Sequence, residues 1–282
     1  MQILRTVDEI RRWSRASRSA PGGTVGLVPT MGALHAGHGS LIRAARTACS
    51  RVAVSLFVNP TQFGPTEDYA RYPRSFDADC ALAEREGAYV LFAPTVDELY
   101  PNGPASTFVE VPDLSGRLDG ASRPGHFRGV ATVVAKLLIA AEPDCAFFGQ
   151  KDAAQVAVLR RMVADLGFAT EIVVCPIVRD PDGLAISSRN VYLSSLQRAQ
   201  ALTLSCAVRH VEALVAQGER RAGVLIAGAR ESFTSEPSIR VDYVELVNWE
   251  TLEAVDTAIP GTLFAVAAFV GKTRLIDNAI LL

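Results

Sequence analysis

Two of the four histidines in this chain, His35 and His38, lie three residues apart. They follow a short apolar run that favours a buried strand, and a helical pattern of apolar residues begins soon after them. In open α/β sheets, ligands bind where the strands end, and the N-terminus of the next helix attracts phosphate. Gly32 and Gly37 would let the backbone approach a ligand closely. The segment therefore indicates a nucleotide phosphate site with two histidines beside it.

Two other interpretations of the histidines stay open on this evidence. A His-x-x-His pair can be half of a metal site, although no nearby Cys, Asp or Glu completes a tetrahedral set of ligands. The pairing can also be accidental, because the motif is short. The segment matches neither G-x-G-x-x-G nor the P-loop, and the P-loop-like Gly271-Lys272-Thr273 has Val266 at its first glycine position.

The pattern around the histidines predicts alternating strands and helices. The expected strands are Thr24 to Val28, Arg51 to Val58, Ala88 to Phe92, Asp144 to Phe148 and Thr170 to Cys175, and the expected helices are Ser40 to Cys49, Phe76 to Glu86, Gly129 to Ala141 and Asp152 to Gly167. Ser14 to Gly23 is expected to be a loop after a short first helix, and Pro29 is expected to end the first strand. Because the strands are apolar throughout, we expect an α/β domain with a doubly wound, Rossmann-like parallel sheet.

The remainder of the chain has a different pattern. Two helices are expected at Leu196 to Gln217 and Arg220 to Thr234, followed by strands at Arg240 to Val247, Thr262 to Phe269 and Thr273 to Asp277. Helices followed by closely linked strands favour a smaller α+β domain. The turn-forming residues 179–183 are expected to form the hinge. We therefore predict domains at 1–178, which binds nucleotide, and 179–282.

The composition excludes several classes of protein. The net charge is −2 and the pI about 6.1, which argues against a dedicated nucleic-acid binder. No segment approaches the roughly 20 apolar residues of a membrane helix, and the first residues lack the apolar core of a signal peptide. The five cysteines form no Cys-x-x-Cys pair, and their odd number prevents a complete disulfide framework. We expect reduced thiols, small-molecule ligands and a cytoplasmic location.

The motifs together resemble a known family. The segment Pro29 to His38 (PTMGALHAGH) is similar to the signature of the adenylyl-transferring HIGH superfamily and, more narrowly, to that of the pantothenate synthetase (pantoate–β-alanine ligase) family. Further segments agree in order: 57–63, 71–74, 100–103, 123–129, 148–152, 182–190 and 275–278. The resemblance implies that ATP and (R)-pantoate give an enzyme-bound pantoyl adenylate and pyrophosphate. β-Alanine then attacks the adenylate, which gives pantothenate and AMP.

The same resemblance implies roles for individual residues. The catalytic set is His35, His38, Lys151, Ser187, Ser188 and Arg189, with the last three as a mobile phosphate clamp. ATP would contact Met31, Gly32, Ala33, Leu34, His35, Ala36, Gly37, His38, Gly149, Gln150, Lys151, Asp152, Val178, Ile186, Ser187, Ser188 and Arg189. Pantoate and β-alanine would contact Gln62, Gln155, Asn59, Tyr72 and Arg123, and Asp79 and Asp152 are the candidate ligands of Mg²⁺. A homodimer is also implied.

Lys151 has support from the residues themselves. It lies at an expected helix start, where the helix dipole repels a cation, and an anionic ligand would resolve that conflict. Gln150 departs from the family, which usually has Glu there. Two other functions remain open. One is a HIGH-superfamily nucleotidylyltransferase with a different acceptor, which would keep the nucleotide on its product. The other is a regulatory protein that binds ATP without turnover.

Overall fold

The computed structural model describes residues 1–65, 67–103 and 107–281. Leu282, the last residue of the predicted second domain, lies outside these ranges. The chain divides into two compact units. Unit 1 comprises Met1–Gly149 and Val158–Pro176, and unit 2 comprises Gln150–Ala157 and Ile177–Leu282. The main division after Pro176 lies two residues before the predicted one.

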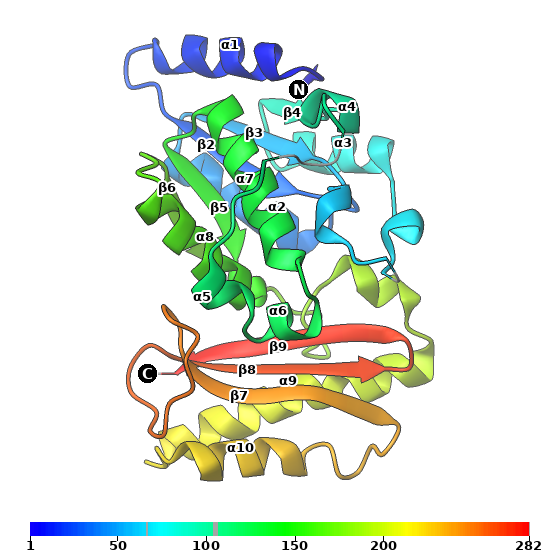
Figure 1. Cartoon of the computed structure of the whole chain (residues 1–282). Helices are drawn as coiled ribbons and strands as arrows, with labels where there is room; N and C mark the ends of the chain where they lie inside the picture. Colours follow the sequence, from blue (N-terminus) through cyan, green and yellow to red (C-terminus); the bar gives the residue numbers. More distant parts are fainter. Residues whose placement is uncertain (66, 104–106, 282) are drawn as a thin grey trace. The chain divides into compact units, whose positions relative to one another are not determined.

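Unit 1 is built on a six-stranded parallel sheet (Figure 1). Its strands are β1 (Gln2–Leu4), β2 (Val25–Thr30), β3 (Arg51–Leu56), β4 (Val90–Phe92), β5 (Cys145–Gly149) and β6 (Glu171–Cys175), in the order β1-β4-β3-β2-β5-β6. From β2 the chain runs outward to β3 and β4 on one side, and β5 and β6 lie on the other side. The predicted doubly wound sheet is confirmed, and its order reverses between β2 and β5, where such folds bind ligands.

Helices cover both faces of this sheet. The α-helices are α1 (Val7–Arg18), α2 (Ala36–Ala48), α3 (Phe76–Arg85), α4 (Val96–Leu99), α5 (Pro112–Ser115), α6 (Asp119–Ser122), α7 (His126–Ala141) and α8 (Ala153–Asp165); short 3-10 turns are η1 (Pro60–Gln62), η2 (Tyr69–Arg71) and η3 (Gln150–Asp152). Ile42 of α2 and Ala83 of α3 pack with Val28, Val54 and Leu91 of the strands. The helices α1 and α7 pack together on the opposite face of the sheet.

Two local predictions in unit 1 are wrong. Pro29 does not end β2: it continues the strand opposite Ser55 of β3. The pairing of β2 with β5 ends at Leu27. Pro29, which has no N–H, therefore costs the sheet no hydrogen bond to β5. Residues from Ser14 onward do not begin a loop, because α1 continues to Arg18. Ser14 is buried there, and its hydroxyl donates to the carbonyl of Ala141 at the end of α7.

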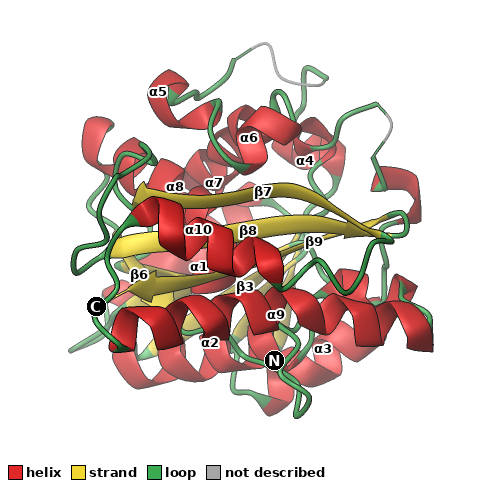
Figure 2. Ribbon diagram, turned by 90° about the horizontal axis from the view of Figure 1, so that it is seen from below, coloured by secondary structure: helices red, strands yellow, loops and turns green. Residues whose placement is uncertain are grey.

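Unit 2 is the predicted smaller α+β body. It contains η4 (Ser188–Tyr192), α9 (Ser195–Ala216), α10 (Ala222–Glu231) and the strands β7 (Ile239–Asn248), β8 (Thr262–Val270) and β9 (Thr273–Leu281). The strands form an antiparallel sheet in the order β7-β8-β9. Figure 2 looks onto α9 and α10, which cover one face of these strands and run roughly along them. Leu204 and Val208 of α9 pack there with Leu225 of α10 and Phe264 of β8.

One segment belongs to a different unit than predicted. Gln150–Ala157, which we assigned to the first domain, packs as part of unit 2. Its partners explain the difference. Asn278 of β9 donates hydrogen bonds to the carbonyls of Gln150 and Lys151, and the indole of Trp249 donates to the carbonyl of Ala153. The turn η3 and the first residue of α8 are therefore held by residues about 100 or more positions later in the chain.

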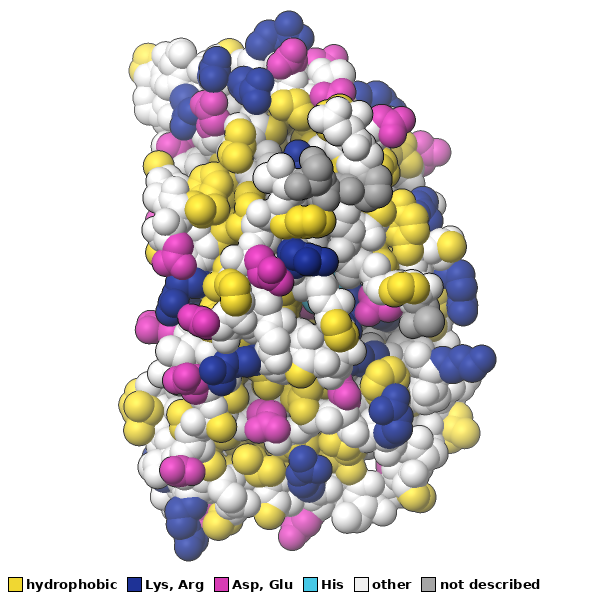
Figure 3. Space-filling model, in the orientation of Figure 1, with side chains coloured by type: hydrophobic (Ala, Val, Ile, Leu, Met, Phe, Trp, Pro, Cys, Tyr) yellow, Lys and Arg dark blue, Asp and Glu magenta, His cyan; other side chains and the backbone are white. Residues whose placement is uncertain are grey.

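The surface agrees with the near-neutral composition. On the face drawn in Figure 3, cationic and anionic side chains are interspersed with apolar ones, and that face carries no continuous basic tract. Among the helices described, none is long and apolar enough to cross a membrane. The five cysteines carry free thiols, as predicted.

Candidate active site

The turn after β2 is held in a conformation that glycine favours. Gly32 has φ +87° and Ala33 has φ +50°, both in the left-handed region. The carboxylate of Asp79, on α3, accepts hydrogen bonds from the backbone N–H groups of Ala33 (3.0 Å) and Leu34 (2.7 Å). A Cβ atom at Gly32 would lie 3.0 Å from Asp79 Oδ2, so a side chain there would press on this carboxylate. Asp79 therefore fixes the turn that leads into the histidines.

His35 and His38 lie together at the start of α2. His35 is the N-cap residue, and the helix begins at Ala36, four residues before the predicted start. The two rings are in contact, with their centroids 4.0 Å apart and their planes tilted by 31°. The backbone N–H of His35 donates to Nδ1 of His38 over 3.3 Å. Because Nδ1 accepts, the proton of the neutral His38 ring lies on Nε2, which makes Nε2–H a hydrogen-bond donor.

Gly37 makes room for this pair of rings. A Cβ atom at position 37 would lie 3.0 Å from both Nδ1 and Cε1 of His35. The first backbone N–H groups of a helix and its dipole attract anions. The start of α2 thus combines helix-end amides with two imidazole rings, all of which are groups that can donate to an anion.

The role of Asp79 can be tested by a single substitution. Asp79→Asn replaces one acceptor oxygen by an N–H group that cannot accept from the turn. We expect the free energy of unfolding to fall by about 1.5 to 3 kcal/mol, the usual range for a hydrogen bond to a charged group. Chemical denaturation with and without Mg²⁺ measures this, with Asp77→Asn at an exposed site of the same helix as the control. A loss that appears only with Mg²⁺ would instead identify Asp79 as a metal ligand.

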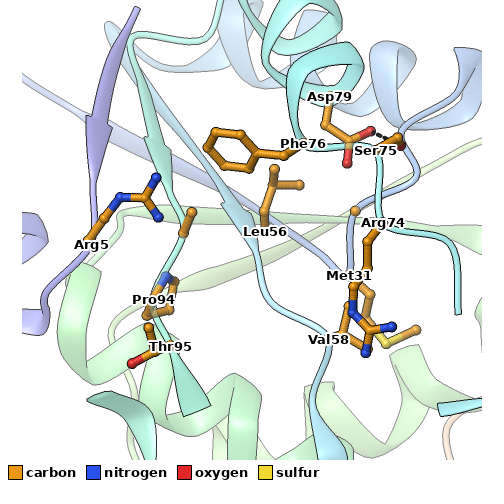
Figure 4. Close-up of a pocket in the computed structure, with 12 residues that line it drawn as sticks. Arg5, Met31, Leu56, Val58, Arg74, Ser75, Phe76, Asp79, Pro94 and Thr95 are labelled. Atoms are coloured by element: carbon orange, nitrogen blue, oxygen red, sulfur yellow. Dashed lines mark hydrogen bonds between the residues drawn. The ribbon is translucent and has the colours of Figure 1, made fainter. Parts of the chain in front are cut away.

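A cavity of about 280 Å³ adjoins the turn (Figure 4). Its lining residues come from the strand ends and from the start of α3: Arg5, Met31, Gly32, Leu56, Val58, Arg74, Ser75, Phe76, Asp79, Ala93, Pro94 and Thr95. The Arg74 guanidinium donates to the carbonyls of Tyr69 and Tyr72, and that of Arg5 lies over the Phe76 ring. The cavity shares Met31 and Gly32 with the predicted ATP-binding turn.

Gln62, predicted to bind pantoate, lies in η1, and Asn59, predicted near β-alanine and phosphate, lies just before it. Gln62 is buried, and its side-chain amide contacts Sδ of Met31 at 2.9 Å. The amide of Asn59 donates to Gln62 Oε1 (3.1 Å) and to the carbonyl of Gly129 (3.0 Å). Its Oδ1 accepts from the hydroxyls of Tyr100 (2.8 Å) and Thr61 (3.0 Å). These bonds use both donors and both lone pairs of Asn59, so its arrangement favours a positioning role over direct substrate contact.

Gly129, which the sequence analysis did not select as a site residue, allows α7 to approach η1. A Cβ atom there would lie 2.3 Å from the Thr61 carbonyl oxygen and 2.6 Å from Gln62 Cα. Tyr100, which is buried, was also missed. Both lie in segments that carry the family resemblance, and this was the signal available in the sequence. Predicted Tyr72 is buried too, and its ring packs edge-on against Phe63.

Arg123 is tied to Gln62 through His126. The Arg123 guanidinium forms a two-bond ion pair with Glu67, at 2.7 Å for each bond, and lies 2.9 Å from His126 Nε2. Since a guanidinium only donates, Nε2 accepts, and Nδ1–H donates to the Gln62 carbonyl over 2.8 Å. Burial raises the pKa of Glu67, but the hydrogen bonds and charge of Arg123 outweigh it and lower that pKa.

Burial, together with the charge of Arg123, lowers the pKa of His126 to about 4. The unfolded chain takes up this proton near pH 6.5, so stability present above pH 6.5 should be lost as the pH falls toward 4. The ring is partly exposed, so about 3 kcal/mol is an upper limit to the loss. Unfolding measured between pH 4 and 7 should show a shallower dependence for His126→Asn. If the pH dependence of unfolding is the same in the variant, His126 does not cause the loss of stability in acid.

In unit 2, Lys151 and Asp152 lie in η3, directly after Gly149 at the end of β5. The Lys151 side chain is 22% exposed and pairs with Asp152 at 3.7 Å. Gln155 follows one turn later on α8 and is partly buried. No group of three or more His, Cys, Asp or Glu in the described ranges could hold a metal ion. The Mg²⁺ roles of Asp79 and Asp152 stay predictions, and the bonds of Asp79 favour a structural role.

The remaining predicted residues lie on a short hairpin and the turn after it. The Ile186 N–H donates to the Val178 carbonyl (3.0 Å), and residues 179–183 form the predicted turn. Arg198 of α9 holds this turn through the carboxylates of Asp180 and Asp182. Ser187 caps η4 by accepting from the Arg189 N–H, and Ser188 and Arg189 are partly exposed.

Comparison with known proteins identifies the family. The family model described as pantoate-beta-alanine ligase matches residues 2–280. A pantothenate synthetase from Acidobacterium capsulatum is 61% identical over 258 residues, 92% of this chain and 86% of that protein. A second, from Koribacter versatilis, is 52% identical over 100% of this chain and 96% of that protein.

Solved structures agree with this result. Pantothenate synthetase from Thermus thermophilus matches with a TM-score of 0.93 and 45% identity over 99% of each chain. Pantoate-beta-alanine ligase from Francisella tularensis, complexed with beta-gamma ATP and beta-alanine, matches with a TM-score of 0.80 and 32% identity over 99% of this chain and 97% of that chain. The chain therefore belongs to the pantoate–β-alanine ligase family and is an AMP-forming ligase.

Proposed function

We propose that this chain condenses (R)-pantoate with β-alanine at the expense of ATP, through an enzyme-bound pantoyl adenylate. The observation that carries the proposal is the His35–His38 pair at the start of α2, in which the Nδ1 of His38 accepts from the His35 N–H and its Nε2–H is therefore the donor side of the ring. The Francisella relative, solved with an ATP analogue and β-alanine, supports ATP and β-alanine as ligands of this family.

In the first step, a pantoate carboxylate oxygen attacks the α-phosphorus of ATP. A bond forms between that oxygen and phosphorus, the bond to the bridging oxygen breaks, and pyrophosphate leaves with the electron pair. Negative charge builds on phosphate oxygens as this happens. Fixed donors stabilise such charge because they need no reorientation during the reaction. We assign this role to His35, His38 and Lys151, with Ser187, Ser188 and Arg189 as a second phosphate clamp.

In the second step, the amine of β-alanine attacks the carbonyl carbon of the adenylate. The C–N bond forms, the bond from that carbon to the phosphate oxygen breaks, the amine loses a proton, and AMP leaves. The protein contributes mainly by holding the two substrates in reactive geometry. A free carboxylate would not react in this way, because its oxygen is a poor leaving group until it is joined to phosphate.

Gln62 and Gln155 are the proposed pantoate-binding residues. Neutral amides can donate to the carboxylate and accept from the hydroxyl groups of a hydroxy acid without adding charge. Asn59, saturated by protein hydrogen bonds, would orient Gln62, while Arg123 and Tyr72 remain candidates for the β-alanine side. The remaining ATP contacts are proposed for the backbone of residues 31–34 and for Gly149, Gln150, Val178 and Ile186.

Mg²⁺ would be held mostly by ATP. This ion binds through few protein carboxylates together with phosphate oxygens and water, so the lack of an acidic cluster in the described ranges fits that mode. Asp152, whose side chain is 49% exposed, is better placed to contribute than the buried Asp79. When bound, Mg²⁺ would neutralise charge on the departing pyrophosphate. A homodimer and a cytoplasmic location also remain proposals from the family.

An ATP turnover assay tests the function. The protein is incubated with Mg-ATP and (R)-pantoate, with and without β-alanine, and AMP and pyrophosphate are followed. The two-step ligase predicts a limited burst of pyrophosphate without β-alanine and continuous AMP release with it. A nucleotide that stays on the product would identify a nucleotidylyltransferase with another acceptor, and ATP binding without pyrophosphate would identify a regulatory protein.

A further inference from the structure

We propose that Asn278, on β9, is a positioning residue for Lys151 and holds it in register with the Ser187–Arg189 clamp. The inference rests on the proposed phosphate-binding role of these residues. Asn278 is 4% exposed, and it lies in unit 2 with both of the segments concerned. No role was assigned to it from the sequence, although it belongs to the segment 275–278 that carries the family resemblance.

The contacts of Asn278 converge on the backbone that bears Lys151. Its Nδ2 donates to the carbonyl oxygens of Gln150 (3.0 Å) and Lys151 (2.9 Å), which uses both of its hydrogens. Its Oδ1 accepts from the side-chain amide of Gln150 over 3.2 Å. One buried amide therefore fixes two successive carbonyl groups of η3. The direction in which the Lys151 side chain leaves the backbone follows from this arrangement.

The preceding residue, Asp277, holds the other segment. Its carboxylate, buried on β9, accepts from Arg179 at 2.6 Å and 2.9 Å, and Arg179 also donates to the carbonyl of Gly183. Burial lowers the pKa of Arg179, but its hydrogen bonds to Asp277 and the carboxylate charge outweigh this and raise it. Arg179 thus stays charged. Its bonds attach the base of the hairpin, which leads on to Ser187, to Asp277 of β9.

Successive residues of a strand point to opposite faces. Asp277 therefore binds Arg179 on one side of β9, and Asn278 binds η3 on the other side. Asp277 Oδ1 also accepts from the backbone N–H of Asn278 at 2.8 Å, which joins the two contacts. The backbone of Lys151 and the base of the hairpin that precedes Ser187 are therefore anchored to adjacent residues of one strand. A shift of η3 relative to β9 would misplace the Lys151 charge with respect to the clamp.

The test is a double-mutant cycle on the full-length chain. Asn278→Ala should reduce kcat for pyrophosphate release about 10- to 100-fold, the range that misplacement by roughly 1 Å produces. The Lys151→Ala variant is itself expected to be slow. In that variant, Asn278→Ala should lower kcat by less than about threefold, because the effects of two residues that act through one group are not additive. Asn278→Asp keeps the volume of the side chain but sets a carboxylate oxygen against the two carbonyl oxygens, which repel it. This variant replaces Asn278→Ala in the cycle if the alanine variant does not fold.

Gln200→Ala is the matched control. Gln200 also lies in unit 2, on α9, and its side-chain amide donates to Glu236 and to the hydroxyl of Ser238. Its kcat should equal that of the parent. If Asn278→Ala lowers kcat by the same factor in the parent and in the Lys151→Ala variant, Asn278 is only a structural residue. That result would overturn this inference but not the proposed function. Full activity of Lys151→Ala would overturn both the inference and the proposed role of Lys151.

Discussion

His38→Ala is expected to reduce the rate of pyrophosphate release about 100- to 1000-fold, as removal of one fixed donor to a developing anion commonly does. The variant should fold normally, because His38 is partly exposed in the first turn of α2 and lies outside the buried core. Pre-steady-state measurement with Mg-ATP and (R)-pantoate would isolate this step from the attack of β-alanine. The thermal unfolding temperature would confirm that the fold is retained.

Two further substitutions identify which ring nitrogen acts. The amide nitrogen of Gln at position 38 can reach the place of Nε2, whereas the shorter side chain of Asn mimics Nδ1. If the Nε2–H of His38 is the donor, His38→Gln should keep a larger part of the rate than His38→Asn. Equal ATP turnover in the parent and His38→Ala would contradict the assignment of His38 to the phosphate.

Gly129→Ala is the second substitution with a large expected effect. The new Cβ would lie 2.3 Å from the Thr61 carbonyl oxygen and 2.6 Å from the backbone nitrogen of Gln62, and both are backbone atoms that cannot rotate away. Either α7 or η1 must move, and the Asn59 contact with the Gly129 carbonyl stretches or breaks. We expect kcat/KM for pantoate to fall about 100-fold, since misplacement by roughly 1 Å can cost that much in rate.

Gly223→Ala in α10 is the control for this effect. No atom lies within 4 Å of the Cβ it would add, so the same chemical change meets open space. Alanine in a helix should raise stability by up to about 1 kcal/mol and leave the kinetics unchanged. A Gly129→Ala variant with parental kcat/KM and stability would show that the close approach of α7 to η1 does not shape the site.

The sheet of unit 1 was predictable because its strands are buried on both faces and therefore read as continuous apolar runs. The start of α2 was harder to predict from the sequence. Gly37 and Gly39 are poor helix formers, and a histidine is not a typical N-cap residue, so the apolar spacing begins only at Leu41. The family resemblance supplied the candidate residues there, while their hydrogen bonds came only from the structure.

Contacts between distant parts of the chain account for what was missed. Asp79 holds a turn 45 residues earlier, and its acidic side chain on a helix gave no sign of this. Gly129 is one of 21 glycines, and nothing local distinguishes a close approach of two backbones from a flexible position. Such pairings depend on the tertiary fold, which the periodicity of one segment does not encode.

The grouping of residues 150–157 with unit 2 has a consequence for the order of events on the ribosome. Lys151 leaves the ribosome 127 residues before Asn278. Until residue 278 has been synthesised, the carbonyls of Gln150 and Lys151 lack the amide that fixes them. The parallel sheet can assemble during synthesis, but the lysine segment must wait. A nascent chain stalled before β9 should therefore acquire its nucleotide-binding fold well before it acquires the capacity to activate a substrate.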